Sequence, residues 1–418
     1  MKADKISYSC AVLRFVVSFI LLASLLVLPN SGCNRNEIGS TFEKGHLKYV
    51  VRTKDRASKT GTVSVRAVSK NISGDIEIPA SVTFGGINYS VTEICVETLF
   101  TERGRLPNVT ASDGVASIPE GAFMGCSGLK SIIIPDSVTS IGDMAFYCCS
   151  SLTNIIIPDS VSSIGKKAFN CCNSLMEIVV GENNPNYSSL DGVLFNKDRT
   201  TLIQCPGSKS GTYTIPDNVT SIGEAAFWGC SSLTDIIIPD SVVFIESGAF
   251  YGCRSLTSLI IPDNVTEIES GAFFFCSSLT NIIIPDSVTE IGKYAFRYCG
   301  SLTNVTIPDS VTSIKSAVFS ECRSLTSIII PDSVTEIGKY AFRYCGSLTS
   351  ITIPDSVTEI GEDAFWGCDK LTDVYFKGNA PKLPEGKAFF DPSVIYYKPG
   401  TTGWRNSWSG RPTKEWIE

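Results

Sequence analysis

Histidine is almost missing from this chain of 418 residues, because His46 is the only one. Most acid–base catalysis and many zinc sites depend on histidine, so the sequence offers little for either. It also has no Cys-x-x-Cys pair, no glycine-rich phosphate loop and no nucleophile elbow. We therefore expect no enzyme activity, no catalytic residues, no metal site and no cofactor, and we interpret His46 as a surface residue.

Clusters of positive charge are missing as well. The chain has 35 Lys and Arg against 42 Asp and Glu, without a basic block. Nucleic-acid binding needs a concentrated positive face, so we exclude nucleic acid as a partner. A hydrophobic content of 43% with only 18% charged residues indicates an ordered protein with a large core.

Long apolar runs are limited to one segment near the N-terminus. Lys2, Lys5 and Arg14 precede the predominantly apolar run from Phe15 to Leu28. At about 1.5 Å per residue, this run is too short to cross a hydrocarbon core of about 30 Å as a helix. Residues 1–32 are therefore predicted to be a signal peptide, and the protein to be exported.

The signal peptide is followed by a cysteine. Asn30-Ser31-Gly32-Cys33 resembles the lipobox of bacterial lipoproteins, although Asn30 stands where that motif usually has Leu. The resemblance implies that Cys33 carries the lipid and that residues 33–46 are a polar tether to the outer membrane or cell surface. Membrane contact would then be made only through the lipid. The alternative is an ordinary signal peptide, cleaved nearby, and a secreted protein.

A period of 23 residues organises most of the remaining chain. Ile-Pro pairs mark it, with one gap of 58 residues that contains an insertion of 35 residues near 180–214; the pairs begin at Ile134, Ile157, Ile215, Ile238, Ile261, Ile284, Ile307, Ile330 and Ile353. Phenylalanine and cysteine recur with the same period, for example at Phe273 and Cys276. A unit this short cannot bury its own apolar face, so the units must stack into a solenoid.

Each unit is expected to contain one short strand. Ile155 and Ile157 point to one face of that strand and Ile156 to the other. The middle position becomes Thr in some units, whereas the flanking positions stay apolar, so the middle position is predicted to face outward. Pro158 then ends the strand, because proline cannot donate to the sheet.

The unit resembles the BspA-like leucine-rich repeat of bacterial surface proteins. The resemblance covers residues 113–376 and implies a leucine-rich-repeat solenoid, a right-handed horseshoe rich in β-structure, with a parallel sheet on the concave face and turns or short helical pieces opposite. Residues 47–112 are predicted to form an N-terminal β cap with a degenerate repeat, and residues 377–418, with three tryptophans, a C-terminal cap. Within the insertion, Gly192–Phe195 and Thr200–Ile203 are expected to form a β-hairpin.

The outward strand positions are the candidate ligand-binding face. They form an aligned apolar row on an almost uncharged sheet, although β-branched residues also suit strands for their own sake; the row comprises Ile133, Ile156, Ile237, Ile260, Ile283, Thr306, Ile329 and Thr352. Family resemblance implies adhesion or interaction with a protein or glycan ligand. The alternative is a structural solenoid that associates with copies of itself.

Two further periodic residues are interpreted as structural. The ten repeat cysteines are expected to be buried thiols, because stacked strands hold equivalent Cβ atoms too far apart and too parallel for disulfides. Cys148 and Cys171 are the pair most suited to a disulfide. The nine aspartates of Pro-Asp are expected to accept hydrogen bonds from local backbone N–H groups, with a calcium-binding stripe as the alternative.

Overall fold

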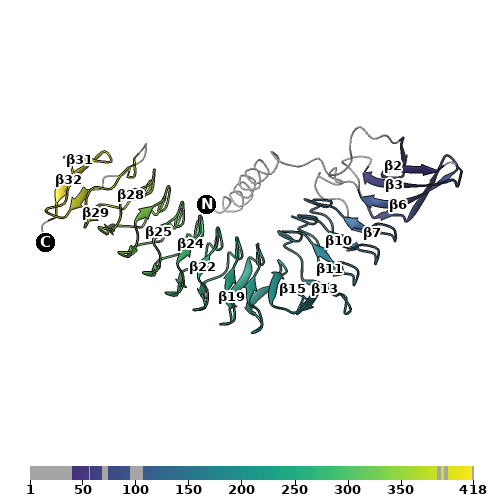
Figure 1. Cartoon of the computed structure of the whole chain (residues 1–418), viewed down its shortest axis with the longest axis horizontal. Coiled ribbons are helices and arrows are strands. Elements are labelled where there is room, and N and C mark those ends of the chain that lie inside the picture. Colours follow the sequence, from purple (N-terminus) through teal and green to yellow (C-terminus); the bar gives the residue numbers. More distant parts are fainter. Residues whose placement is uncertain are drawn as a thin grey trace, which may run out of the picture.

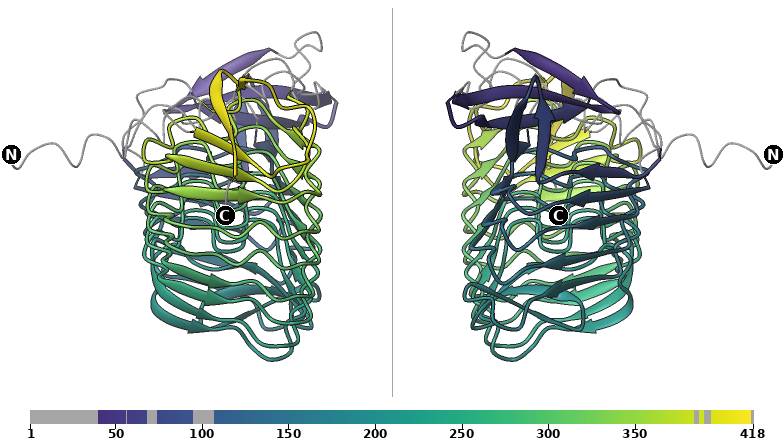
Figure 2. Two further views of the ribbon diagram at one scale, coloured as in Figure 1. Left: turned by 90° about the vertical axis from the view of Figure 1, so that its left-hand side faces the viewer. Right: turned by 90° about the vertical axis from the view of Figure 1, so that its right-hand side faces the viewer.

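The computed structural model describes residues 40–55, 57–67, 74–94, 107–383, 387–389 and 394–416. Cys33 and the predicted signal peptide lie outside these ranges. Stacked rungs of 23 residues form a crescent with a β-sheet at its N-terminal end (Figure 1), and the rungs lie behind one another when viewed along the stack (Figure 2). The structure confirms the predicted leucine-rich-repeat solenoid.

Most rungs have a strand at the Ile-x-Ile position of the repeat. These strands pair in parallel with one another, and the pairs Asn154↔Glu177 and Ile157↔Val180 show that equivalent repeat positions are in register. The strands are β4 (Ile76–Ile78), β7 (Asn108–Ala111), β9 (Ser131–Ile133), β11 (Asn154–Ile157), β13 (Glu177–Val180), β17 (Ser210–Thr214), β19 (Ser232–Ile237), β21 (Ser258–Ile260), β23 (Asn281–Ile283), β27 (Ser350–Ile353) and β29 (Asp373–Phe376).

A second, two-residue strand follows the Pro-Asp turn. Its isoleucine points into the core in most rungs, as at Ile222 and Ile245. These strands are β8 (Ser117–Ile118), β10 (Ser140–Ile141), β12 (Ser163–Ile164), β18 (Ser221–Ile222), β20 (Phe244–Ile245), β22 (Glu267–Ile268), β24 (Glu290–Ile291), β25 (Ser313–Ile314), β26 (Glu336–Ile337) and β28 (Glu359–Ile360).

Turns close the third side of each rung. The sequence predicted either turns or short helical pieces on this side. Backbone hydrogen bonds link these turns between rungs, as from Phe250 N–H to the Ala272 carbonyl at 2.8 Å. Within the described ranges the chain has no helix, and therefore no helix that could span a membrane.

Stacked phenylalanines fill the centre of the solenoid. Neighbouring rings from Phe227 to Phe365 lie 5.1–5.6 Å apart with nearly parallel planes. The side chains are almost completely buried. Each full ring burial is worth about 1.5–3 kcal/mol of transfer free energy, so the stack provides much of the driving force for adding a rung.

The insertion divides this core into two clusters. One cluster extends from Phe42 to Leu194, and the other from Val193 to Ile395. Between them, β14 (Tyr187–Leu190), β15 (Val193–Asn196) and β16 (Thr201–Gln204) form an antiparallel sheet. Val193 belongs to the C-terminal cluster and Leu194 to the N-terminal one, because neighbouring strand residues face opposite ways.

The N-terminal end of the solenoid is covered by a five-stranded sheet. It contains β1 (Thr41–Lys44), β2 (Leu47–Asp55), β3 (Thr60–Ala67), β6 (Ile87–Ile94) and β5 (Ser81–Phe84), in that order. A hairpin turning at Gly85 and Gly86, both with left-handed φ, joins β5 to β6. Residues 41–44, which were expected to belong to the polar tether, pair with β2 instead.

The C-terminal end is covered by β30 (Val394–Tyr397), β32 (Arg411–Glu415) and β31 (Ser407–Trp408), which continue the sheet beyond β29. Two of the three tryptophans pack on the last core layer: Trp404 lies 4.9 Å and Trp408 5.2 Å from the ring of Phe376. Trp416 lies elsewhere, against Tyr375 on the outward face of the sheet. The cap therefore covers the core with two tryptophans rather than three.

Candidate functional site

The middle residue of each Ile-x-Ile strand faces solvent, as the sequence predicted. Strand alternation buries Ile155 and Ile157 and leaves 59% of Ile156 exposed. The other isoleucines of the candidate row are exposed to a similar degree: Ile133 60%, Ile237 53%, Ile260 66%, Ile283 53% and Ile329 78%. Thr306 is exposed and Thr352 partly exposed. We name this aligned set of outward residues the Ile face.

Pairing extends the Ile face beyond the eight positions chosen from the sequence. Val179 lies opposite Ile156, and Thr214 lies opposite Ile237. At the C-terminal end, Tyr375 pairs with Thr352, and Tyr396 pairs with Tyr375. The sequence analysis missed Val179, Tyr375 and Tyr396 because their rungs lack the Ile-Pro pair. Thr214 does precede such a pair, Ile215-Pro216, but was left out of the candidate row.

Threonines beside the Ile face tie the rungs together. The hydroxyl of Thr280 donates to the carbonyl of Thr257 at 3.0 Å, and Thr303 donates to Thr280 at 3.3 Å. The residue two positions before the outward one, on the same face of the strand, is usually Ser or Asn. Charge therefore occurs on this surface at few rungs, one of them with Asp235. The result is an apolar row on an ordered sheet with little charge to desolvate.

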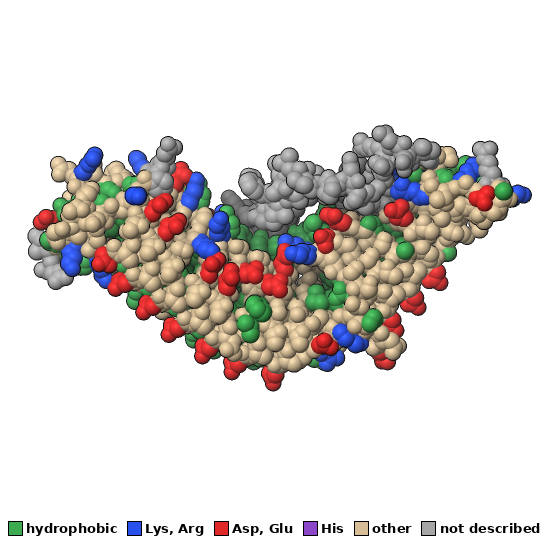
Figure 3. Space-filling view, viewed as in Figure 1, with side chains coloured by type: hydrophobic (Ala, Val, Ile, Leu, Met, Phe, Trp, Pro, Cys, Tyr) green, Lys and Arg blue, Asp and Glu red, His purple; other side chains and the backbone are tan. Residues whose placement is uncertain are grey.

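The Pro-Asp aspartates form a separate stripe. All nine side chains are exposed, and Figure 3 shows a regular row of single acidic side chains along the convex edge of the crescent. Among these nine, only Asp159 accepts a hydrogen bond from a backbone N–H, that of Asn183 at 3.1 Å. The expectation of turn bonding by each aspartate is therefore wrong. The following serine bonds the turn instead, as from the Ser241 hydroxyl to the Val219 carbonyl at 2.7 Å.

The repeat cysteines are free and buried, as predicted. Eight of the thiols donate to the carbonyl of a phenylalanine in the preceding rung at 3.1–3.3 Å, for example Cys276 to Phe250. Burial raises the pKa of Cys276 to about 12. These thiols are therefore protonated donors that help to stack the rungs, and they are poor nucleophiles.

Cys148 and Cys171, the pair considered for a disulfide, are both free and only partly buried. Both have left-handed backbone conformations, with φ of 60°. A hydrogen bond from the Cys148 thiol lowers the pKa of Cys171, and the same bond, with burial, raises the pKa of Cys148. Of the two, Cys171 is the more readily ionised thiol.

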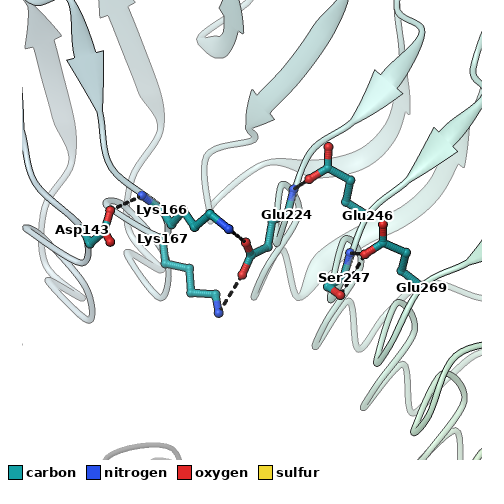
Figure 4. A network of polar contacts seen from close by, with 7 residues as sticks. All are labelled: Asp143, Lys166, Lys167, Glu224, Glu246, Ser247 and Glu269. Carbon is teal, nitrogen blue, oxygen red and sulfur yellow. Dashed lines mark hydrogen bonds and ion pairs between the residues drawn. The ribbon is translucent and has the colours of Figure 1, made fainter. Parts of the chain in front are cut away.

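A polar network crosses the insertion. Both Lys166 and Lys167 contact the carboxylate of Glu224 at 2.9 Å, so a rung before the insertion is bridged to one after it (Figure 4). Glu246 then accepts the backbone N–H of Glu224 at 3.0 Å. The described residues contain no group of three or more His, Cys, Asp or Glu arranged to hold a metal ion. We interpret the network as a link between the two parts of the solenoid.

A row of aromatic rings and guanidinium groups lies on the turn side of the rungs. It contains the residue that follows the repeat phenylalanine, including Trp228, Tyr251, Phe274, Arg297 and Arg343. Trp228 stacks on Tyr251 at 3.8 Å, and Tyr251 on Phe274 at 4.8 Å. We name this the turn row. The sequence analysis missed it because this repeat position varies among aromatic, basic and small residues, so no single letter marks it.

Solved bacterial leucine-rich repeat structures match this chain. A leucine-rich cell surface protein from Faecalibacterium prausnitzii is 28% identical over 82% of this chain and 96% of its own, with a TM-score of 0.52. A leucine-rich repeat protein from Eubacterium ventriosum is 23% identical over 84% and 99%, with a TM-score of 0.54. One from Bacteroides ovatus is 26% identical over 90% and 100%, with a TM-score of 0.46. No curated protein matches the chain.

A family model for the BspA-type leucine-rich repeat region matches residues 93–207, 205–323 and 289–393. These ranges contain all the complete rungs and the insertion, and together they cover more than half of the sequence. The match agrees with the resemblance found in the repeat unit and with the stacked rungs of the structure. The chain therefore belongs to the BspA-type leucine-rich repeat family.

Proposed function

We propose that this protein is exported, is anchored at the bacterial surface through a lipid on Cys33, and binds a protein partner through the Ile face. The observation that carries the binding proposal is the aligned row in which six isoleucines are exposed by 53–78%. Surface display is supported by family membership and by the cell surface protein of similar fold.

An apolar protein surface fits the Ile face better than a glycan does. Isoleucine offers no hydrogen-bond donor or acceptor to sugar hydroxyls, but it loses little on desolvation. Burial of apolar area contributes about 25 cal/mol per Å², so each isoleucine covered by a partner contributes on the order of 1–2 kcal/mol. A row of this length exceeds the scattered apolar exposure that is usual for a protein surface.

Crosslinking can identify the partner. A photoreactive amino acid placed at position 260 should capture a protein on intact cells, and the same group at Asp263, in the aspartate stripe, should not. The affinity of the captured protein is then measured against variants. Replacing Ile237, Ile260 and Ile283 together by Ser should lower it at least tenfold, with circular dichroism and melting retained.

Replacing Asp240, Asp263 and Asp286 by Asn is the matched control and should change affinity little. Calcium-dependent binding that is lost in this control, with the Ser variant still binding, would reverse the assignment of the functional face. If the captured protein is a second copy of this chain and the solution mass is that of a stable oligomer, the self-assembling solenoid replaces our proposal.

The anchor is tested separately. Mass spectrometry of the membrane fraction should find mature chains that begin at Cys33 and carry acyl groups. An unmodified N-terminus at another residue would contradict the lipid anchor without affecting the assignment of the Ile face.

A further inference from the structure

Arg297 and Arg343 of the turn row occupy the same repeat position two rungs apart, within identical local sequences. Each guanidinium lies among three aromatic rings. For Arg297 the ring centroids lie 5.0 Å (Tyr298), 5.7 Å (Tyr294) and 5.9 Å (Phe274) from Cζ. For Arg343 they lie at 5.0 Å (Tyr340), 5.0 Å (Tyr344) and 5.2 Å (Trp366).

One donor atom of each arginine, Nε, is left without an acceptor. In each, Nε is buried without a hydrogen-bond partner, and among the described residues only Asn170 shares this property. Neither guanidinium forms an ion pair with a described carboxylate. Cation–π contacts use the faces of a guanidinium and leave its five N–H donors, which lie in the plane, unused. Because Nε is closed off from solvent, a ligand could supply an acceptor only to the terminal nitrogens of these two partly exposed side chains.

The tyrosines beside each arginine are held in an unfavourable backbone conformation. Tyr294, Tyr298, Tyr340 and Tyr344 have left-handed φ values of 61–65°. Other rungs have left-handed φ at the same positions, either with glycine, as at Gly248 and Gly252, or with another residue, as at Ala225 and Glu321, so this conformation belongs to the turn. A side chain in this region costs on the order of 1–3 kcal/mol. Packing alone does not require these tyrosines, because glycine supports the same turn elsewhere.

Charge in the surrounding rungs leaves the site positive. On the rung between the arginines, the carboxylate of Glu321 is already bound by Arg323 at 2.8 Å. Asp363 lies near Arg343, but Ala317 holds the equivalent position next to Arg297. On the rung between the arginines, Ser320 occupies the equivalent repeat position. The Ser320 side chain is only 2% exposed, because longer neighbouring side chains cover it.

We propose that Arg297 and Arg343, with their flanking tyrosines, bind the carboxylate or sulfate groups of an acidic polysaccharide. Arginine pairs with such groups through two parallel hydrogen bonds. The tyrosine rings offer apolar surface against which the C–H faces of sugar rings can pack. This site lies on the turn side and does not depend on the Ile face.

The spacing favours a polysaccharide over an acidic peptide. Two steps of 5.6 Å each separate Phe296, before Arg297, from Phe342, before Arg343. Side chains on one face of an extended peptide recur about every 6.8 Å, so neither one nor two such intervals fits this distance. A disaccharide repeat in an extended chain has nearly this length and could place one acidic group at each arginine.

The test uses the purified full chain and three probes: a chondroitin sulfate hexasaccharide, a neutral hexasaccharide and a hexaglutamate peptide. Calorimetry should detect binding of the sulfated sugar alone, weakened by added salt. Replacing both arginines by Gln should lower this affinity at least tenfold, and replacing both by Lys should restore little of it, because lysine lacks the planar donors. Arg297→Gln alone should cost more than Arg343→Gln, since only Arg343 has Asp363 nearby.

Matched controls separate this site from net charge and from the Ile face. Lys377→Gln with Lys398→Gln removes the same charge elsewhere and should change affinity less than twofold. The Ser variant of the Ile face should bind the sugar normally. Tyr298→Gly with Tyr344→Gly should keep the fold while affinity falls at least fivefold. The proposal would be overturned if the lysine control lost as much affinity as the arginine variant. It would also be overturned if hexaglutamate bound as tightly as the sugar, or if the sulfated sugar did not bind.

Discussion

Ile282–Thr303 and Ile328–Thr349 have identical sequences and lie two rungs apart, so the molecule contains its own comparison of one sequence in two surroundings. Inside the solenoid the two copies are equivalent. Phe296 and Phe342 are fully buried and stack on both neighbours, and Cys299 and Cys345 donate to phenylalanine carbonyls at the same distance, 3.2 Å. The core environment therefore repeats with the sequence.

Outside, the copies differ. Lys339 pairs with Glu362 of the next rung, whereas Lys293 has no ion pair with a described residue. Ile283 lies in a paired strand and is 53% exposed, whereas Ile329 makes a single bridge to Thr306 and is 78% exposed. The difference teaches that a rung's own sequence determines its interior, while the neighbouring rungs determine its surface charge and exposure.

The largest expected effect tests the equivalence of the interiors. Phe296→Ala and Phe342→Ala each remove a fully buried ring, and we expect each to lower the free energy of unfolding by about 3–5 kcal/mol. Urea unfolding of the two variants should give the same loss. Clearly unequal losses would mean that the core environment does not repeat with the sequence.

A smaller effect concerns the two equivalent cysteines. Burial raises the pKa of Cys299 and Cys345 well above the usual thiol value of 9.0. The unfolded chain therefore loses these protons first, and stability should fall as the pH rises above about 9. Each thiol contributes at most about 1.4 kcal/mol per pH unit. Urea unfolding from pH 8 to 11 should show a shallower fall for Cys299→Ala and Cys345→Ala, equal in both; an unchanged slope would contradict this.

The smallest effect tests the difference between the surfaces. Lys339→Ala removes an exposed ion pair and should lower the melting temperature slightly in low salt, with no effect in high salt because exposed pairs are screened. Lys293→Ala removes an unpaired lysine and should change nothing in either condition. A matching decrease in both variants would show that the lysine side chain, rather than its pairing, is what matters.

Strict repetition made the fold and the direction of the Ile face predictable from sequence. Where the pattern is interrupted, prediction failed. Val179 belongs to the same row, but its own rung has Val180-Gly181 in place of the Ile-Pro pair. Residues 41–44 pair in a sheet although three of the four are polar. In both cases the structure depends on strand pairing with a distant segment, and this pairing cannot be predicted from the local sequence.

The site on the turn side could not be predicted for a different reason. Arg297 becomes notable only when Phe274 of the previous rung and its own flanking tyrosines surround it, and when no carboxylate does. The prediction that each Pro-Asp aspartate bonds its own turn was wrong for a related reason. Ser and Asp are adjacent and both suit turns, but at Ser241 it is the hydroxyl that reaches the carbonyl of the previous rung. Such choices depend on distances between rungs.

The division of the core at the insertion has a mechanical consequence. A bound protein held at one end and a lipid anchor at the other would load the molecule in tension. The two clusters contain different side chains on the two faces of β15, and the Lys166–Glu224 bridge is one of the polar links between the parts. We expect the two halves to unfold at different forces, so that one can extend under load while the other stays folded and bound to the partner. The insertion would then serve as an extensible joint in an attachment that must survive shear.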